Sequence, residues 1–281
     1  MIAITGATGN LGRATIQQLL KTVSPENITA IVRDPNKLET VPGMQVKIAD
    51  YDDYNSLVAA FSGADTLLQI SSASYGDHAT FQEEQVVKAA AAAGIQHLVY
   101  TSTLQPSSAA IFDGGRTCYN TEVAIRNSGM HYTIFRNSMY LETIPLFIGP
   151  AMETGQIRYP GGEGAISFVG REDIAKALAK VLAAPAKGGR SFNITGDHAY
   201  SFGDIARILG EERGLPATYT NISEEEFRTE MEGFGLPPEA VDFYSSMAAS
   251  IRNREFSLTD MTWQQFLDKP TLDIRAFLGE N

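Results

Sequence analysis

The sequence predicts an α/β fold built on a parallel, doubly wound sheet, with a smaller, mainly helical lobe formed by the C-terminal part of the chain. Three observations indicate this class. Short β-branched runs alternate with amphipathic segments up to about residue 135, a glycine-rich turn joins the first strand to the first helix, and the rhythm changes near Pro145. Strands that alternate with helices at this spacing are typical of a parallel sheet.

The first half of the chain supplies the alternating elements. Apolar and β-branched runs predict strands at residues 2–4, 27–32, 44–49, 66–70, 97–100 and 131–135. Helices are expected between them, at residues 13–23, 54–61, 78–93 and 119–127. Gly94 follows the third of these helices and is a typical C-terminal stop.

The second half is more irregular. Glycines at residues 155–164 predict a hairpin, and residues 171–182 and 191–195 predict a helix and a short strand. Two capping patterns, Ser201-x-x-Asp204 and Ser223-x-x-Glu226, predict the starts of two further helices.

These patterns predict two structural units. We expect one domain over residues 1–145 and a smaller lobe over residues 146–281. Segments around 165–196 are expected to return to the first domain. A chain of 281 residues is long enough to bury the core of a domain with an added lobe.

Charge and composition exclude several classes of function. The formal net charge is −11 and no Lys/Arg cluster occurs, whereas nucleic-acid binding needs a basic stripe, so we expect no nucleic-acid partner. No apolar run approaches the ~20 residues of a membrane span, and the first expected strand begins at residue 2, so we expect neither a membrane segment nor a signal peptide.

The cysteine and histidine content points to a reducing compartment and to chemistry without a metal. Cys118 is the one cysteine of the sequence and cannot form an internal disulfide, which fits a cytoplasmic protein. The four histidines are widely scattered and offer no metal-ligand spacing.

The glycine-rich turn at residues 6–12 predicts a dinucleotide site. Free N–H groups at the start of a helix bind a pyrophosphate, and glycine lets the backbone approach it. In this interpretation Gly6 makes the tight turn, Gly9 lets the ligand approach, and Gly12 lets the helix pack on the strand. Thr8, Asn10 and Leu11 complete the phosphate-binding corner of a Rossmann-type fold. A glycine-rich turn without a ligand is the alternative.

The residues after the second strand distinguish two cofactors. An acidic residue there accepts from the ribose of NAD, whereas an arginine pairs with the 2′-phosphate of NADP. Arg33 comes first and Asp34 second, which favours NADP over NAD. A solvated arginine in a turn is the alternative for Arg33. Asp50 follows the third strand and is expected either to face the adenine or to cap the next helix.

The ends of the remaining strands are expected on the same rim, because ligands of doubly wound sheets bind beyond the carboxyl ends of the strands. This rule brings residues 71–74, 101–102 and 137–140 together. Thr101 and Ser102 are expected either to contact a substrate carbonyl or to satisfy the backbone at a strand end.

Several stretches of the chain, taken together, resemble a known family. They include the glycine motif 2–12, the run Ala30-Ile31-Val32-Arg33-Asp34-Pro35, and residues 49–51, 68–72 and 100–102. They also include Arg136-Asn137 within 132–140, Arg171-Glu172-Asp173 and residues 192–196. The sequence resembles the NmrA-like, atypical short-chain dehydrogenases/reductases, and most closely the bacterial type 2 NAD(P)H:quinone oxidoreductases.

The resemblance implies a Rossmann domain with a small lobe, a preference for NADPH, and hydride transfer to a quinone or similar conjugated acceptor without flavin or metal. Carried over by position, the nicotinamide end of the cofactor is expected at residues 71–75, with Ser71, Ser72 and Ala73 as binding residues. It is also expected at residues 137–142, with Asn137, Ser138 and Tyr140 as binding residues, and Arg171 is expected at the cofactor or the cleft.

One departure from the larger superfamily concerns acid catalysis. That superfamily uses a Tyr-x-x-x-Lys pair, but four residues after Tyr119 stands Val123. The proton is therefore expected from water or from a nearby hydroxyl. Tyr140 is the best candidate for that hydroxyl, with an aromatic wall of the cleft as its alternative role. The absence of the lysine also leaves open a non-catalytic NADP-binding redox sensor that contacts a protein partner.

Other side chains have two interpretations each. His78 is expected to be a solvated residue at a helix start or, less favoured, a catalytic one. Arg136 is expected to form a structural ion pair or, less favoured, to contact the substrate. A group of apolar residues is expected to form either a substrate lid or part of the core: Phe147, Met152, Phe234, Phe243, Tyr244 and Met247.

Overall fold

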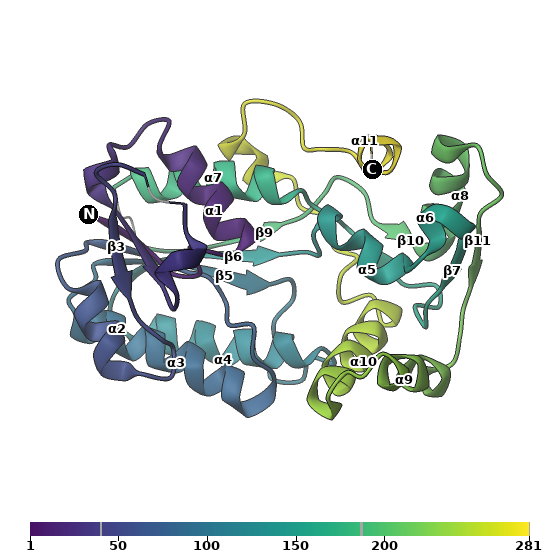
Figure 1. Ribbon diagram of the computed structural model, residues 1–281, viewed down its shortest axis with the longest axis horizontal. Helices are drawn as coiled ribbons and strands as arrows, with labels where there is room; N and C mark the ends of the chain where they lie inside the picture. The colour runs from purple at the N-terminus through teal and green to yellow at the C-terminus, as the bar shows by residue number, and fades with distance from the viewer. Residues whose placement is uncertain (40, 186–187, 281) are drawn as a thin grey trace.

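A parallel sheet forms the centre of the molecule. The computed structural model describes residues 1–39, 41–185 and 188–280. Within these residues one sheet has seven strands in the order β3-β2-β1-β4-β5-β6-β9, and all neighbours are parallel (Figure 1). The strands are β1 (Ile2–Ile4), β2 (Ile28–Val32), β3 (Gln45–Ile48), β4 (Thr66–Gln69), β5 (His97–Thr103), β6 (His131–Asn137) and β9 (Gly189–Ile194). The strand order reverses between β1 and β4, which is the point where ligands of such sheets bind.

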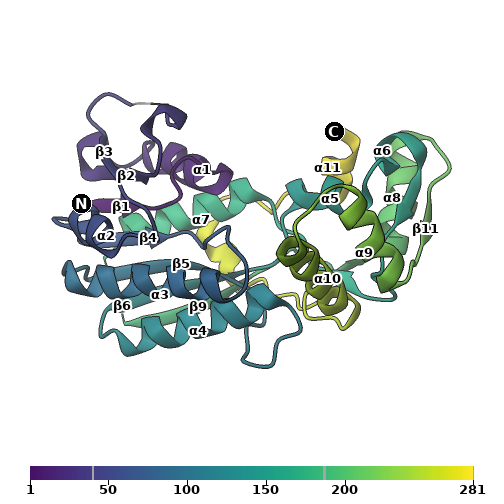
Figure 2. The same cartoon turned by 60° about the horizontal axis from the view of Figure 1, so that its bottom comes forward.

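Helices cover both faces of this sheet, as Figures 1 and 2 show. One face carries α1 (Asn10–Leu19) and α7 (Arg171–Ala183), which pack against each other over an apolar core that includes the fully buried Trp263. The other face carries α2 (Tyr54–Phe61), α3 (Gly76–Ala92) and α4 (Asp113–Asn127). The predicted α/β, doubly wound fold is confirmed.

The C-terminal portion is mainly helical, as predicted, and lies at the right of Figure 1. Its helices are α5 (Ile144–Ile148), α6 (Ala151–Thr154), α8 (Phe202–Arg213), α9 (Glu224–Gly233), α10 (Pro238–Arg252) and α11 (Ile274–Glu280). Two short strand pairs accompany them: β7 (Gln156–Arg158) with β11 (Thr218–Thr220), and β8 (Ala165–Ile166) with β10 (Tyr200–Ser201). This portion has its own apolar core, which includes Phe168, Phe202 and Ile251.

The capping patterns of the C-terminal portion form as predicted. The Ser201 and Ser223 side chains accept from the backbone N–H groups of Asp204 and Glu226, whose carboxylates accept in return from the serine N–H groups. Two otherwise unsatisfied donors are bonded at each helix start.

The hairpin predicted at residues 155–164 is wrong. β7 lies in this range and β8 directly follows it, and both pair with distant partners, β7 with β11 and β8 with β10. The glycines serve other contacts: Gly155 ends α6 at a φ of +70°, and a Cβ on Gly164 would lie 2.1 Å from the Ile251 carbonyl oxygen. The glycines also form a local turn, in which the Gly164 N–H donates to the Gly161 carbonyl at 3.0 Å, but the strands on either side of it do not pair with each other.

Two elements from the second half return to the sheet. β9 pairs with β6, from Tyr132 opposite Gly189 to Asn137 opposite Ile194, and α7 packs on α1. The division into domains at residue 145 stays a prediction. No helix in the described ranges is long and apolar enough to cross a membrane.

Candidate dinucleotide and substrate site

The glycine turn between β1 and α1 has the geometry of a phosphate-binding corner. Gly6 has a φ of +61°, a conformation that favours glycine, and its carbonyl accepts from the Gly9 N–H at 2.9 Å. A Cβ on Gly12 would lie 2.2 Å from the Gly6 carbonyl oxygen, so Gly12 packs on the turn itself. At Gly9 a Cβ would meet only that same oxygen, at 3.2 Å. The fold thus requires glycine at 6 and 12, and leaves Gly9 open to solvent.

The start of α1 has no side-chain cap. Gly9 is its N-cap residue, and the first turn holds no acidic side chain. The N–H groups of Asn10 and Leu11 belong to the helix start, where no carbonyl of the helix can accept them. Thr8 lies beside them, half-buried, and its carbonyl accepts from Arg13 Nε at 2.8 Å. This end of the helix is suited to an anion.

A basic group lies beside that corner. Arg33 directly follows β2 and is exposed, and within the described residues its guanidinium forms no ion pair. Arg13 donates to the Lys37 carbonyl, which ties the glycine turn to the loop after β2. Asp34 caps the short helical turn 35–37 through the Asn36 N–H, so its carboxylate is engaged by its own loop. A phosphate group near Arg33 would therefore meet an unpaired guanidinium.

Asp50 does not cap the next helix, because Asp53 does so through the Ser56 N–H at 3.1 Å. The Asp50 carboxylate instead accepts from the Asp52 N–H. Tyr51, its neighbour, donates to the Ile70 carbonyl at 2.7 Å and holds this loop against the end of β4. Asp50 remains half-buried at the rim, where the predicted contact with adenine stays a prediction.

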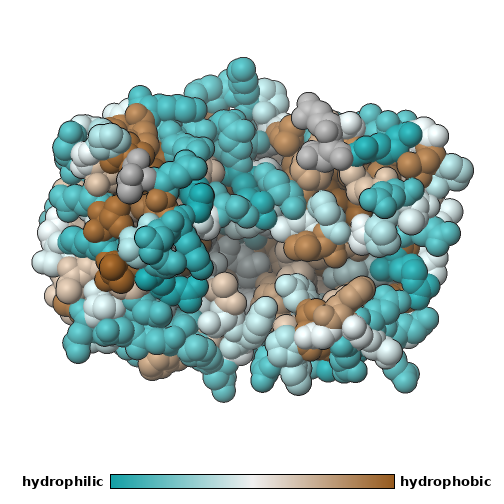
Figure 3. Space-filling view, in the orientation of Figure 1, coloured by the Kyte–Doolittle hydropathy of each residue, from teal (hydrophilic) through white to brown (hydrophobic). Residues whose placement is uncertain are grey.

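A pocket of about 390 Å³ lies at the carboxyl ends of β4, β5 and β6. Its volume falls in the ~300–1,000 Å³ range of small-molecule sites. The walls come from residues 71–76 after β4, from residues 137–140 after β6 and from Phe243 and Tyr244 of α10. Figure 3 shows the surface hollowed between the two halves of the molecule. The structure thus brings together the two segments predicted for the nicotinamide end.

Several polar groups of the first wall are bonded within the protein. The Ser71 N–H donates to Thr101 Oγ1 at 3.1 Å, and the Ser72 hydroxyl donates to Gln82. Ala73 is exposed at the pocket. Ser102 lines the pocket, but its hydroxyl donates to Glu122 at 2.8 Å. The bonds of Thr101 and Ser102 are thus made within the protein, as expected if these side chains satisfy groups at the strand end and do not contact a substrate carbonyl.

The second wall carries an acceptor atom without a partner. Asn137 is 4% exposed, and its Oδ1 has no hydrogen-bond partner in the part of the chain that the structure describes. Its Nδ2 donates to the Tyr140 hydroxyl at 3.4 Å. The Ser138 hydroxyl, by contrast, accepts from Ser167. A buried acceptor in a pocket wall is suited to a ligand that brings a donor.

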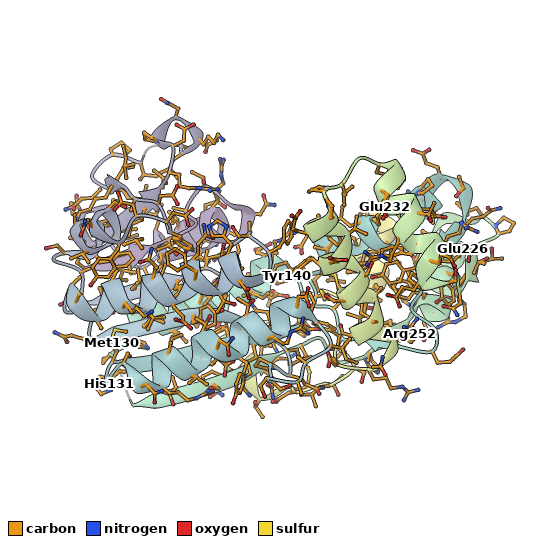
Figure 4. All side chains as sticks on the ribbon, turned by 90° about the horizontal axis from the view of Figure 1, so that it is seen from below. Met130, His131, Tyr140, Glu226, Glu232 and Arg252 are labelled. Carbon is orange, nitrogen blue, oxygen red and sulfur yellow. The ribbon has the colours of Figure 1, made fainter. Side chains whose placement is uncertain are left out.

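Tyr140 lies where the sheet meets the C-terminal helices (Figure 4). The Arg171 guanidinium carbon lies 5.2 Å from the centre of its ring, and the Arg171 N–H donates to the Glu142 carboxylate. Burial raises the pKa of Tyr140 above its usual range, although the Asn137 bond and the charge of Arg171 act in the opposite direction. The phenol is therefore neutral at neutral pH and able to donate a hydrogen bond.

An ion-pair cluster around Glu122 lies next to the pocket, behind the lining residue Ser102. Glu122 is fully buried, and Arg136 donates to both its oxygens, at 2.9 and 2.7 Å, while Arg126 and Ser102 bond it as well. Burial alone would raise the pKa of this carboxyl, but the Arg136 and Ser102 bonds lower it below its usual range. The expected structural ion pair of Arg136 is confirmed.

The apolar residues expected to form a lid or part of the core lie in three different places: the core, the surface and the pocket wall. Phe147 is buried, and Met152 and Met247 pack against the C-terminal core. Phe234 is 76% exposed at the end of α9. Phe243 and Tyr244 line the pocket as well as touching the core.

His78 and Tyr119 lie outside the pocket wall. His78 is exposed on α3 and its Nε2 lies 2.7 Å from Asp52 Oδ1, in agreement with a solvated position. Tyr119 lies half-buried on α4, and Val123, one turn on, is 38% exposed. Among the described residues, no group of three or more His, Cys, Asp or Glu side chains could hold a metal ion.

A family model described as the NmrA-like family matches residues 1–264. The chain belongs to the NmrA-like family. It is 36% identical over 244 residues to quinone oxidoreductase 2 of Escherichia coli, covering 86% of this chain and 85% of that protein. It is 25% identical over 251 residues to an NAD(P)H azoreductase of Xenophilus azovorans, with 89% and 86% covered.

Solved structures with NADP cofactors are similar over the whole chain. The NADPH complex of the Escherichia coli NADPH-dependent quinone oxidoreductase superposes with a TM-score of 0.92 at 32% identity, covering 100% of this chain and 99% of that one. The NADP(H) complex of Citrobacter triphenylmethane reductase gives a TM-score of 0.90 at 31% identity, with 100% and 99% covered.

Sequence reasoning missed two features of this NmrA-like chain. Glu83 of α3 lines the pocket although it is 1% exposed, and Phe112 reaches the pocket from the loop before α4. Neither stands in a motif. Glu83 lies one helical turn after Ala79 on the face of α3 that is buried against the sheet, and a charged residue on such a face is the signal that could have found it.

Proposed function

We propose that the chain is an NADPH-dependent reductase that transfers a hydride to a quinone or a similar flat, conjugated acceptor. The observation that carries the proposal is the pocket shared by residues 71–76, residues 137–140 and α10, at the carboxyl ends of the central strands. The NADPH-dependent quinone oxidoreductase and the triphenylmethane reductase named above have the same fold over the same length.

The residues at the corner fit NADP. The uncapped start of α1 supplies amide donors, and Gly9 leaves space for the ligand. Arg33, which forms no ion pair within the described residues, supplies a guanidinium for the 2′-phosphate. Bound NADPH supplies the hydride. In this arrangement Asn137 Oδ1 accepts from the nicotinamide amide or from a substrate hydroxyl, because it has no partner in the described protein.

The rest of the pocket orients an acceptor and excludes water. Phe112, Phe243 and Tyr244 present aromatic surface to a flat ring. The neutral Tyr140 hydroxyl donates a hydrogen bond to an acceptor carbonyl, where negative charge grows as the carbonyl is reduced. A quinone is a strong hydride acceptor, so holding the two rings face to face is the main task of the protein.

Steady-state oxidation of NADPH with a panel of benzoquinones, naphthoquinones and triphenylmethane dyes tests this proposal. We expect saturable NADPH consumption with at least one class of flat acceptor and much slower consumption of NADH. Tight NADPH binding with no oxidation across the panel would contradict it, and would favour an NADP sensor that contacts a protein partner.

A further inference from the structure

One carboxyl group lies in the wall of the substrate pocket. Glu83 is the only acidic residue among the described residues that line it. Its side chain is 1% exposed, accepts from the Ser72 N–H through Oε1 and accepts from Gln69 Nε2 at 2.7 Å through Oε2. These bonds fix the carboxyl against the loop that follows β4, the segment expected beside the nicotinamide.

This carboxyl has no cationic partner. Within the described residues it forms no ion pair, in contrast to the buried Glu122, which pairs with two arginines. Burial raises the pKa of Glu83 to about 7, although the bonds from Ser72, Gln69 and Tyr100 lower it. The group therefore changes its charge near neutral pH and responds to any new charge placed in the pocket.

The groups that face Glu83 from neighbouring elements do not titrate near neutral pH. Burial raises the pKa of Tyr51, before α2, and of Tyr100, on β5, well above neutrality. Burial also raises the pKa of Cys118, on α4, to about 12. On α3 itself, the exposed His78 pairs with Asp52, whose pKa this contact holds below its usual range.

We propose that Glu83 exchanges a proton in step with the redox state of the cofactor: it is protonated beside the neutral reduced nicotinamide and ionised beside the cationic oxidised ring. The inference rests on the proposed function, which places the nicotinamide end in this pocket. An opposite charge in a water-poor site favours the ionised carboxylate, and this attraction is stronger there than in water.

The proton balance follows from this exchange. Reduction of a quinone by NADPH needs one hydride and one proton. The O–H bond of Glu83 breaks, the proton passes to the reduced acceptor, and the electron pair of that bond stays on the carboxylate. Glu83 takes a proton from solvent when the oxidised cofactor leaves, so the site returns to its starting state.

Equilibrium binding of NADP⁺ and of NADPH, measured separately from about pH 6 to about pH 8, tests the proposal without turnover. Both ligands carry the same 2′-phosphate, so its titration cancels in the ratio of their dissociation constants. As pH rises over this range, we expect the dissociation constant of NADP⁺ to fall about tenfold relative to that of NADPH. The reason is that ionised Glu83 attracts only the oxidised ring. Calorimetry in buffers of different ionisation enthalpy should record more protons released when NADP⁺ binds near pH 6 than when NADPH binds, a difference from which the phosphate also cancels.

Three variants complete the experiment. Glu83→Gln should abolish both the change in the ratio and the difference in released protons between NADP⁺ and NADPH. Glu84→Gln, on the next residue of α3, and His78→Gln, which removes the nearby imidazole, should keep both. Calorimetry of the protons released on ligand binding to the unmodified protein tests the proposal even if Glu83→Gln does not fold.

Two different failures are distinguishable. Parallel pH dependence of the two ligands in a protein that reduces quinones would overturn the role of Glu83 and leave the proposed function standing. Absence of binding by either ligand would overturn the proposed cofactor site and the role of Glu83 with it.

Discussion

The rings of Tyr75 and Phe243 lie 5.0 Å apart, centre to centre, at a tilt of 52°. Tyr75 precedes α3 on the sheet side, and Phe243 lies on α10 of the C-terminal portion. Phe243 also packs 5.1 Å from Phe112. This contact joins the two portions of the chain at the mouth of the pocket, so the substrate wall is made by both.

Replacing Phe243 by alanine should weaken substrate binding more than cofactor binding. The change removes ring contacts worth about 0.5–1.5 kcal/mol beyond area burial, so we expect the KM for a naphthoquinone to rise roughly 2- to 10-fold. The dissociation constant of NADPH should stay within about twofold, as fluorescence titration would measure.

Phe234→Ala is the matched control, because Phe234 is 76% exposed and lies outside the pocket wall. It should leave both constants unchanged. Equal changes in the two variants would show that the effect of Phe243 is not local to the pocket.

Replacing Gly12 by alanine should destabilise the glycine corner. The new Cβ would lie 2.2 Å from the Gly6 carbonyl oxygen, a backbone atom that cannot move without shifting the turn. Overpacking of this kind costs about 1–3 kcal/mol, measurable by urea unfolding, and NADPH affinity should fall with it. Gly233→Ala, whose Cβ would meet nothing within 4 Å, should be neutral or slightly stabilising.

Replacing Arg33 by alanine should separate the two cofactors. Loss of charge-assisted bonds to the 2′-phosphate costs about 1.5–3 kcal/mol, so NADPH binding should weaken roughly 10- to 100-fold. NADH lacks this phosphate and should bind within about twofold of its original affinity. If both ligands weaken equally, Arg33 does not bind the 2′-phosphate.

Replacing Arg136 by methionine should lower the free energy of unfolding much more than a surface substitution does. It leaves the fully buried Glu122 with Arg126 as its one remaining cationic partner among the described residues. Breaking a buried pair costs about 3–5 kcal/mol. The double variant Arg136→Met with Glu122→Gln should recover part of the loss in urea unfolding, whereas a strictly additive result would refute the pairing.

Glu83 should make the unfolding free energy of the protein depend on pH. Its pKa is raised in the folded state, to about 7, so its contribution to stability is complete below the unfolded pKa and is lost as pH rises through 7. The unfolding free energy of the native chain should therefore fall relative to Glu83→Gln between about pH 5 and pH 8, by up to about 3 kcal/mol. A constant difference over that range would mean that the carboxyl is not buried as the structure has it.

The parts of the fold that depend on local pattern could be predicted from the sequence. The alternating strands, the helix 54–61 and both capping boxes follow from short-range spacing. The hairpin at 155–164 could not be excluded, because the close approach of Gly164 to Ile251 depends on α10, far along the chain.

The candidate site divides in the same way. The rule for strand ends brought Ser71 and Asn137 to one pocket, because it depends only on parallel strands meeting at one edge. The aromatic wall at Phe243 and the carboxyl of Glu83 depend on how α10 and α3 pack on that edge, which periodicity does not specify. For the same reason, lid and core could not be distinguished for the apolar residues of the C-terminal portion.

A single-turnover experiment tests the central claim most directly. Protein carrying one equivalent of NADPH is mixed with excess naphthoquinone without oxygen, and loss of the reduced nicotinamide absorbance is followed together with formation of hydroquinone. The account predicts that one hydroquinone forms for each bound NADPH, faster than in free solution. Bound NADPH that stays reduced, or that reacts no faster than free NADPH, would contradict it.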